Sequence, residues 1–283
     1  MHIAEKHTDI RSQSPRQETN WLGCAAGRAI GELLLSIYGP ITRAWLAKQL
    51  DGVSQSRGLY VGCGDGSDAV LLASSAADGS NLTGTNGDTL QIEKALFEIG
   101  CSGQKHINST YSELAGFDKA GAFDLLFSQF LNPGFPAKAS EWANLARVLK
   151  PGGVLFLQVV DLSGLNSFPY NHALARSVEL IGKFGNKPFQ ASNLQDFALE
   201  LLKDAGFERF ETTFSPAAFL PTESNHILSL FLEWRKAEIL TNALTSREEF
   251  NSLLMELKYY ESQPDTLISR PRMYQIKAKR KAD

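Results

Sequence analysis

The chain is poor in cysteine, has no long apolar run and carries no excess of positive charge. Its 283 residues include only three cysteines, an odd number without metal-like spacing. This disfavours a disulfide scaffold and suits a reducing compartment. No apolar segment is long enough to span a bilayer, and residues 1–20 lack the apolar run of a signal peptide. We therefore expect a cytoplasmic protein with a mobile N-terminal arm and no membrane partner.

The charge balance also limits the partners. The formal net charge of −3 gives no attraction toward a phosphate backbone, so nucleic acid is not the expected substrate. A hydrophobic content of 43% predicts a folded protein with one sizeable core. The sequence does not fix the oligomeric state, and a homodimer remains one alternative.

Apolar periodicity predicts alternating strands and helices from residue 59 to residue 213. The expected strands are 59–62, 81–86, 105–108, 123–127, 154–160, 207–213 and 273–278, and the expected helices are 67–75, 89–99, 137–149 and 193–205. Such alternation implies right-handed βαβ units and a mostly parallel sheet. The expected fold is therefore α/β and Rossmann-like.

Three further segments are expected to be helical additions to one domain that spans residues 21–283. Residues 21–50 show helical spacing, which Gly39-Pro40 is expected to break into two helices that form a flap over a pocket. Residues 162–190 and 215–270 interrupt the alternation and are expected to form lids.

A glycine-rich turn, Gly62-Cys63-Gly64-Asp65-Gly66, directly follows the first expected strand. Glycines there let the chain turn tightly, bring the backbone close to a ligand and aim helix N-terminal amides at it. The spacing is G-x-G-x-G, which differs from the G-x-G-x-x-G of dinucleotide sites, and no Gly-Lys-Ser/Thr follows as in a P-loop. Taken alone, the turn indicates only a nucleotide-type site.

Four other motifs follow the glycine turn in a consistent order. They are Leu82-Thr83-Gly84-Thr85-Asn86, Phe123-Asp124, the run Arg147-Val148-Leu149-Lys150-Pro151-Gly152-Gly153, and Leu201-Leu202-Lys203-Asp204-Ala205-Gly206-Phe207. Together with the turn they resemble the class I S-adenosylmethionine-dependent methyltransferases, in particular a branch that acts on small molecules. The resemblance implies a seven-stranded, mostly parallel sheet with helices on both faces and an antiparallel last strand.

The resemblance also implies a cofactor, S-adenosylmethionine, with S-adenosylhomocysteine as the product. The chain departs from the family at three usually acidic positions: Tyr60 before the glycine turn, Asn86 at the ribose position and Thr110 near the adenine. The cofactor is thus expected to be held with fewer carboxylates than usual. The cofactor-binding residues that the resemblance implies are Tyr60, Gly62, Cys63, Gly64, Asp65, Gly66, Asn86, Gly87, Gln91, Ser109, Thr110, Tyr111, Ser128 and Gln129. No metal site is expected.

Methyl transfer depends on alignment and exclusion of water, and it needs a base when the acceptor must lose a proton. Histidine suits that role near neutral pH. His172 and His226 lie in the two expected lids and are the candidate general bases, with a surface or capping role as the alternative for each. The family often has a histidine after its fourth strand, but Gln129-Phe130-Leu131-Asn132 supplies none.

The expected function is methyl transfer to a small, partly apolar acceptor molecule, foremost at oxygen, with nitrogen, carbon and sulfur left open. Aromatic residues in and beside the lids, including Phe168, Tyr170 and Phe214, suit such an acceptor, and the alternative is that they pack the added helices against the sheet. Two other functions remain: a non-methylating biosynthetic step, such as a cyclisation with the cofactor bound, and a non-catalytic partner subunit.

Overall fold

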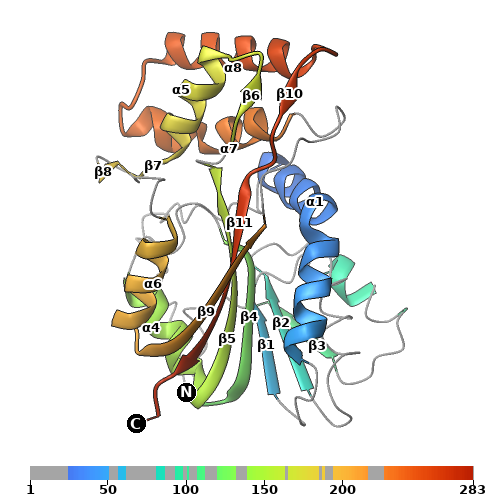
Figure 1. Cartoon of the computed structure of the whole chain (residues 1–283), viewed down its shortest axis with the longest axis vertical. Coiled ribbons are helices and arrows are strands. Elements are labelled where there is room, and N and C mark those ends of the chain that lie inside the picture. The colour runs from blue at the N-terminus through green and yellow to red at the C-terminus, as the bar shows by residue number, and fades with distance from the viewer. Residues whose placement is uncertain are drawn as a thin grey trace, which may run out of the picture.

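The protein consists of a twisted sheet with a helical cap above one of its edges (Figure 1). The computed structural model describes residues 25–50, 57–61, 81–86, 93–97, 101, 107–111, 120–131, 139–162, 165–184, 187–188, 194–215 and 226–282.

Seven strands make up the sheet, in the order β3-β2-β1-β4-β5-β11-β9. Their bounds are β1 Arg57–Val61, β2 Asn81–Asn86, β3 Ile107–Tyr111, β4 Phe123–Leu131, β5 Leu149–Asp161, β9 Phe207–Ser215 and β11 Arg272–Arg280. Strands β1 to β5 pair in parallel, and β11 is antiparallel to both of its neighbours. The predicted Rossmann-like fold, with mostly parallel strands and an antiparallel last strand, is confirmed.

Helices cover both faces of the sheet, as predicted (Figure 1). On one face α4 (Ala139–Val148) and α6 (Leu194–Asp204) pack their apolar side chains, among them Trp142 and Leu202, against Leu155 and Leu157 of β5. Helix α1 (Ala25–Leu50) packs on the opposite face against Phe156. Because successive side chains of a strand point to opposite faces, β5 must be apolar at nearly every position.

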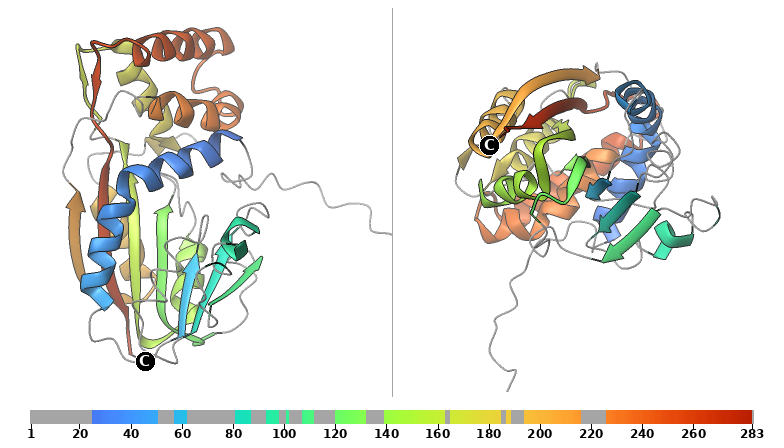
Figure 2. Two further views of the ribbon diagram at one scale, coloured as in Figure 1. Left: turned by 90° about the vertical axis from the view of Figure 1, so that its right-hand side faces the viewer. Right: turned by 90° about the horizontal axis from the view of Figure 1, so that it is seen from below.

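The expected break at Gly39-Pro40 is wrong. Helix α1 is continuous, with Pro40 inside it, and it bends instead (Figure 2). Proline has no N–H to donate to the preceding turn, which favours a bend. The helix continues because both halves are held by packing: Leu34 contacts the apolar core of the cap, and Leu46 contacts the sheet.

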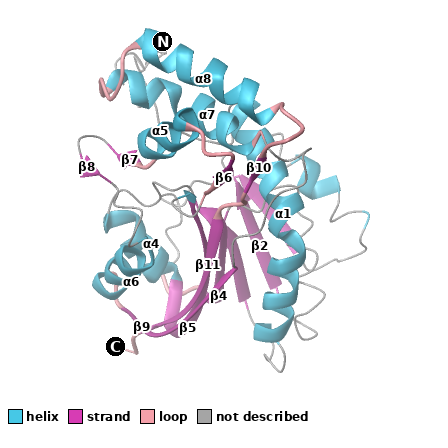
Figure 3. Ribbon diagram, turned by 45° about the horizontal axis from the view of Figure 1, so that its top comes forward, coloured by secondary structure: helices cyan, strands magenta, loops and turns pink. Residues whose placement is uncertain are grey.

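The two expected lids pack together into a single cap (Figures 1 and 3). The cap contains α5 (His172–Ile181), α7 (Ile227–Thr241) and α8 (Arg247–Glu261), with a ribbon of β6 (Ser167–Phe168) and β10 (Leu267–Ile268), and the short pair β7 (Lys183–Phe184) and β8 (Lys187–Pro188) follows α5. Leu174, Phe231 and Phe250, one from each helix, belong to the same buried cluster. The cap is therefore one packed body built from two distant segments.

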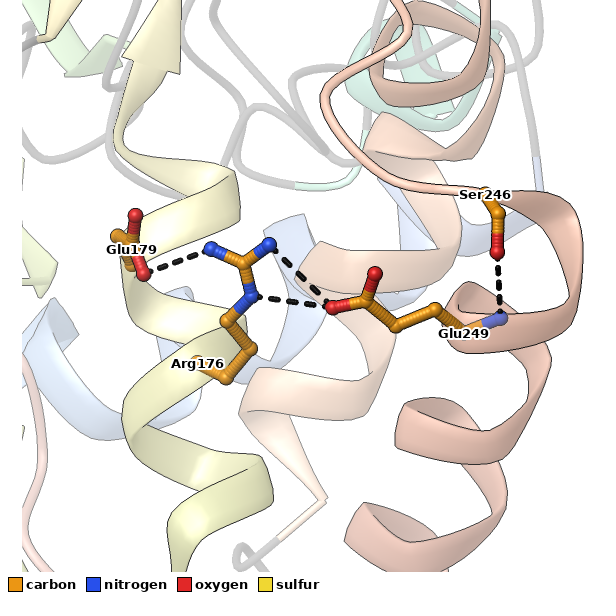
Figure 4. Close-up of polar contacts among 4 residues, drawn as sticks. All are labelled: Arg176, Glu179, Ser246 and Glu249. Atoms are coloured by element: carbon orange, nitrogen blue, oxygen red, sulfur yellow. Dashed lines mark hydrogen bonds and ion pairs between the residues drawn. The ribbon is translucent and has the colours of Figure 1, made fainter.

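The ion pair between Arg176 and Glu249 joins the same two segments on the surface of the cap (Figure 4). The Arg176 guanidinium on α5 lies 2.8 Å from Glu179 Oε2 and 3.3 Å from Glu249 Oε1 on α8. The backbone N–H of Glu249 donates to Ser246 Oγ at 3.0 Å, which caps α8. One arginine thus links α5 to the capped first turn of α8.

The cap stands over the carboxyl ends of the parallel strands. The chain passes from the sheet into the cap after Asp161, the last residue of β5. It returns to the sheet at Arg272, the first residue of β11. The two residues are register partners, with Arg272 Nε 3.3 Å from Asp161 Oδ2. The chain therefore crosses between sheet and cap through an ion pair at this edge.

The opposite, amino end of the sheet contains the Lys150-Pro151-Gly152-Gly153 run at the start of β5. Lys150 Nζ lies 2.6 Å from Asp124 Oδ1, and the backbone N–H of Arg57 donates to Asp124 Oδ2 at 2.9 Å. Partial burial acts to raise the pKa of Asp124, but the hydrogen bonds and charge of Lys150 and Arg57 lower it overall. This family motif therefore fixes the ends of β1, β4 and β5 and lies away from the carboxyl edge.

Candidate functional site

The strand order reverses between β1 and β4. From β1 the chain builds outward through β2 and β3, and it then returns to place β4 and β5 on the other side. In open α/β sheets, ligands bind outside the carboxyl ends of the strands at such a reversal. The topology therefore places the candidate site beyond Val61 of β1 and Leu131 of β4, at the edge covered by the cap (Figure 1).

Tyr60 and Gln129 meet at this reversal. Strand alternation places them on the face that α1 covers, where Tyr60 is 1% exposed and Gln129 is 4% exposed. The Tyr60 hydroxyl donates a hydrogen bond to Gln129 Oε1. The Tyr60 ring also packs on Phe127, its register partner, with ring centroids 4.7 Å apart. The residue that replaces the family's acid is thus buried and hydrogen-bonded to the neighbouring strand.

The Gln129 amide has one polar atom, Nε2, that is buried and makes no hydrogen bond within the described residues. Because Oε1 accepts from Tyr60, the remaining group is an N–H donor. A buried, unsatisfied donor is costly and calls for an acceptor. It therefore fits a ligand that presents an oxygen at this point.

Other buried polar side chains continue from Gln129 across the same face. Gln158 of β5 exchanges hydrogen bonds with Thr42 of α1, at 3.2 Å to Oε1 and 3.0 Å from Nε2. Gln275 of β11 is the register partner of both Gln158 and Thr213, and its Oε1 accepts from Thr213 Oγ1 at 3.1 Å. Sequence analysis missed these residues, although a glutamine within an apolar strand is itself an unusual feature.

Ser128, a predicted cofactor contact, points to the other face of β4. Its Oγ donates to the Val61 carbonyl at 3.3 Å, and the residue is fully buried. Val61 is the last residue before the glycine turn. The hydroxyl therefore holds the end of β1 from which the turn starts.

The remaining predicted cofactor residues are only partly covered by the structure. Gly62, Cys63, Gly64, Asp65, Gly66, Gly87 and Gln91 lie outside the described residues. Asn86 ends β2, and Ser109, Thr110 and Tyr111 end β3, with Asn86 and Tyr111 as register partners. Strand pairing thus brings these backbone positions to the same carboxyl edge as Tyr60 and Gln129.

The two candidate bases lie in the cap. His172 is the first residue of α5, and His226 directly precedes α7; both side chains are exposed. Asn171, rather than His172, caps α5, because its Oδ1 accepts from the Leu174 N–H at 2.8 Å. Among the hydrogen bonds of the described residues, none joins either imidazole to Tyr60 or Gln129, so their catalytic role stays a prediction.

Three of the aromatic residues that the sequence analysis singled out face the surface. Phe168 is 66% exposed, Tyr170 76% and Phe214 62%. Their rings neither fill the core nor pack the cap on the sheet, since the apolar side chains of the helices occupy that interior. The alternative that these rings pack the added helices against the sheet is therefore wrong for these three positions, and a role in lining a pocket stays a prediction.

Two other features are absent from the described residues. No helix there is both long and apolar enough to cross a membrane. The same part of the chain groups no three histidine, cysteine, aspartate or glutamate side chains in a way that would hold a metal ion.

Comparison with known proteins identifies the sheet region. The family model of the methyltransferase domain matches residues 59–157. The ubiquinone biosynthesis O-methyltransferase of Aromatoleum aromaticum is 29% identical over 124 residues, which are 43% of this chain and 51% of that protein. The chain thus aligns with about half the length of this curated relative.

Solved structures share the fold at lower identity. Phosphoethanolamine N-methyltransferase 2 of Haemonchus contortus is 16% identical, with a TM-score of 0.52 over 91% of this chain and 57% of that one. The (4+2)-cyclase SpnF is 18% identical, with a TM-score of 0.50 over 86% and 81%. At these identities the likeness concerns the fold alone. Residues 59–157 are thus similar to a methyltransferase domain, and the strand order is that of a Rossmann-like methyltransferase fold.

Proposed function

We propose that this protein transfers a methyl group from S-adenosylmethionine to an oxygen atom of a small, partly apolar molecule. The observation that carries the proposal is the buried Tyr60–Gln129 pair at the strand-order reversal, with an amide donor directed at no protein acceptor in the described residues. Relatives named ubiquinone biosynthesis O-methyltransferase, 27–29% identical over 43% of the chain, support oxygen as the accepting atom.

Each part of the carboxyl edge has a proposed role in binding. The Gly62–Gly66 turn and Gln129 hold the amino-acid part of the cofactor, Asn86 bonds the ribose hydroxyls, and Thr110 lies near the adenine. When bound, S-adenosylmethionine supplies a methyl group made electrophilic by its sulfonium. The cap of α5, α7 and α8 covers this edge (Figure 3) and keeps water from the reacting atoms.

A hydroxyl acceptor must also lose its proton. We propose His172 and His226 as the candidate general bases, because both belong to the cap and imidazole titrates near neutral pH. Replacing each by alanine, one at a time, separates them. The variant that lacks the general base should lose most of its kcat while its cofactor affinity stays unchanged. The other variant should match wild type.

Calorimetric titration tests the proposal directly. The wild-type protein should bind S-adenosylmethionine and S-adenosylhomocysteine, and Gly64→Val should abolish both, because a branched side chain would intrude where backbone must approach the ligand. No heat with either compound for the wild type would overturn the proposal and favour a non-catalytic partner subunit.

A second assay separates methyl transfer from other chemistry. Small hydroxylated aromatic compounds are offered as acceptors, and S-adenosylhomocysteine release is measured beside product formation. Methyl transfer releases one S-adenosylhomocysteine for each product molecule. Product without that release would instead identify a non-methylating reaction such as a cyclisation.

A further inference from the structure

The Tyr60–Gln129 hydrogen bond reverses the polarity of the site. In the proteins that this chain resembles, the position of Tyr60 is usually acidic and presents an acceptor to the ammonium group of the cofactor. Here the Tyr60 hydroxyl donates to Gln129 Oε1, and the group that the pair presents is the Gln129 Nε2 donor. An acceptor carrying a charge has been replaced by a neutral donor.

We propose that Gln129 Nε2 donates a hydrogen bond to the carboxylate of the cofactor's amino-acid part, so that Gln129 determines specificity through the carboxylate. This inference rests on the proposed function, because it concerns the same cofactor site. Tyr60 is the positioning residue: its hydroxyl holds the amide with oxygen inward and nitrogen toward the ligand.

Position supports the carboxylate as the partner. The β1–β4 register ends at Val61 and Ser128, and Gln129 follows one residue beyond. It therefore lies just beyond the end of β1, and in the sequence β1 is followed directly by the turn proposed to hold the amino-acid end of the cofactor. At that end only the carboxylate oxygens can accept a hydrogen bond, because the ammonium and the sulfonium cannot.

Burial makes the contact selective. Gln129 is 4% exposed and accepts a hydrogen bond from Tyr60, whose ring packs on Phe127, so water competes poorly for its N–H groups. A hydrogen bond to an ionised group is stronger than one between neutral groups. A cofactor analogue without its carboxylate would leave this donor unsatisfied.

The test compares three probes: S-adenosylmethionine, S-adenosylhomocysteine and decarboxylated S-adenosylmethionine. Affinities are measured by titration calorimetry, with urea unfolding as the check on folding. Gln129→Leu should weaken binding of the two carboxylate-containing probes by roughly 10- to 100-fold, as expected for a hydrogen bond to a charged group. Its affinity for the decarboxylated probe should stay within about twofold of the wild-type affinity for that probe.

Gln129→Glu replaces the neutral amide by a negatively charged carboxylate in a side chain of the same shape, so it tests which charge of the cofactor lies beside this residue. At mildly alkaline pH the new carboxylate should repel the cofactor carboxylate, so S-adenosylmethionine should bind more weakly than to Gln129→Leu. Tyr60→Phe removes the orienting hydroxyl and should weaken binding of the carboxylate-containing probes only. Gln158→Leu, which removes a buried amide of the same face whose Oε1 and Nε2 both bond Thr42, is the control and should leave all three affinities unchanged.

Two outcomes would overturn the inference alone. One is tighter binding of S-adenosylmethionine by Gln129→Glu than by wild type, which would place the ammonium or sulfonium beside this residue. The other is an equal loss for all three probes in Gln129→Leu, which would make the residue structural. If the wild-type protein binds none of the probes, the proposed function fails together with the inference.

Discussion

Glu261, the last residue of α8, accepts a hydrogen bond from the backbone N–H of Ser229 in the first turn of α7, at 3.0 Å. His226, at the N-cap position of α7, makes no side-chain capping bond, so the carboxylate caps this helix from a distant segment. Burial nevertheless raises the pKa of Glu261 to about 7, against the opposing hydrogen bonds from Ser229 and Leu228 and the charge of Lys258.

This raised pKa predicts a pH-dependent stability of the cap. The folded pKa lies above the ordinary value of 4.5, so the folded state binds the proton more tightly than the unfolded state. The stabilisation is complete below that ordinary value and is lost as pH rises through about 7. Its upper limit is about 3 kcal/mol, from the size of the shift.

Glu261→Gln isolates this contribution, since it keeps the accepting oxygen without the charge. Urea unfolding of both proteins between mildly acidic and mildly alkaline pH should show the variant gaining stability relative to wild type as pH rises. A constant difference across that range would mean that Glu261 titrates normally.

The Thr42–Gln158 contact predicts how α1 is fixed to the sheet. Both side chains are fully buried, so Thr42→Val should leave the Gln158 amide unsatisfied and lower the free energy of unfolding by about 1–3 kcal/mol. Replacing both, with Gln158→Leu, should cost less than the sum of the two single changes. Additive losses in denaturant unfolding would show that the pair is not coupled.

Gly152 and Gly153, near the start of β5, should differ in their tolerance of alanine. A Cβ on Gly153 would lie 2.9 Å from the Lys150 carbonyl oxygen and 3.1 Å from that of Asp124, both of them backbone atoms. Gly153→Ala should therefore cost about 2 kcal/mol or more. Gly152 has open space but a φ of +76°, so Gly152→Ala should cost about 1 kcal/mol. Equal melting temperatures for the two variants would contradict this ranking.

Asn86 tests the proposed ribose contact at the end of β2. Asn86→Ala should weaken S-adenosylmethionine binding by about 1 kcal/mol, the loss of one hydrogen bond between neutral groups. Titration calorimetry measures the change. Wild-type affinity in this variant would place the ribose contact at another residue.

Many strands and helices of the sheet region could be predicted because the apolar pattern that specifies each of them lies within a short segment. The strand over residues 81–86 matches β2 as predicted, and the helix expected over residues 193–205 differs from α6 by one residue at each end. The expectation failed at Pro40, where local propensity argued for a break and packing on two sides kept α1 continuous. The exposure of Phe168 and Tyr170 could not be predicted either, because composition does not show which side chains face solvent.

The sequence by itself determined the Rossmann-like fold and predicted the cofactor and a site with few carboxylates, because glycine spacing, strand periodicity and residue type are properties of short segments. Only the tertiary structure placed the Tyr60 hydroxyl beside the Gln129 amide and packed the two lids into one cap. It also placed the Glu261 carboxylate at the start of α7. These relationships connect residues that are 69 and 32 positions apart in the chain. They depend on strand order and on helix packing, and no local pattern encodes either.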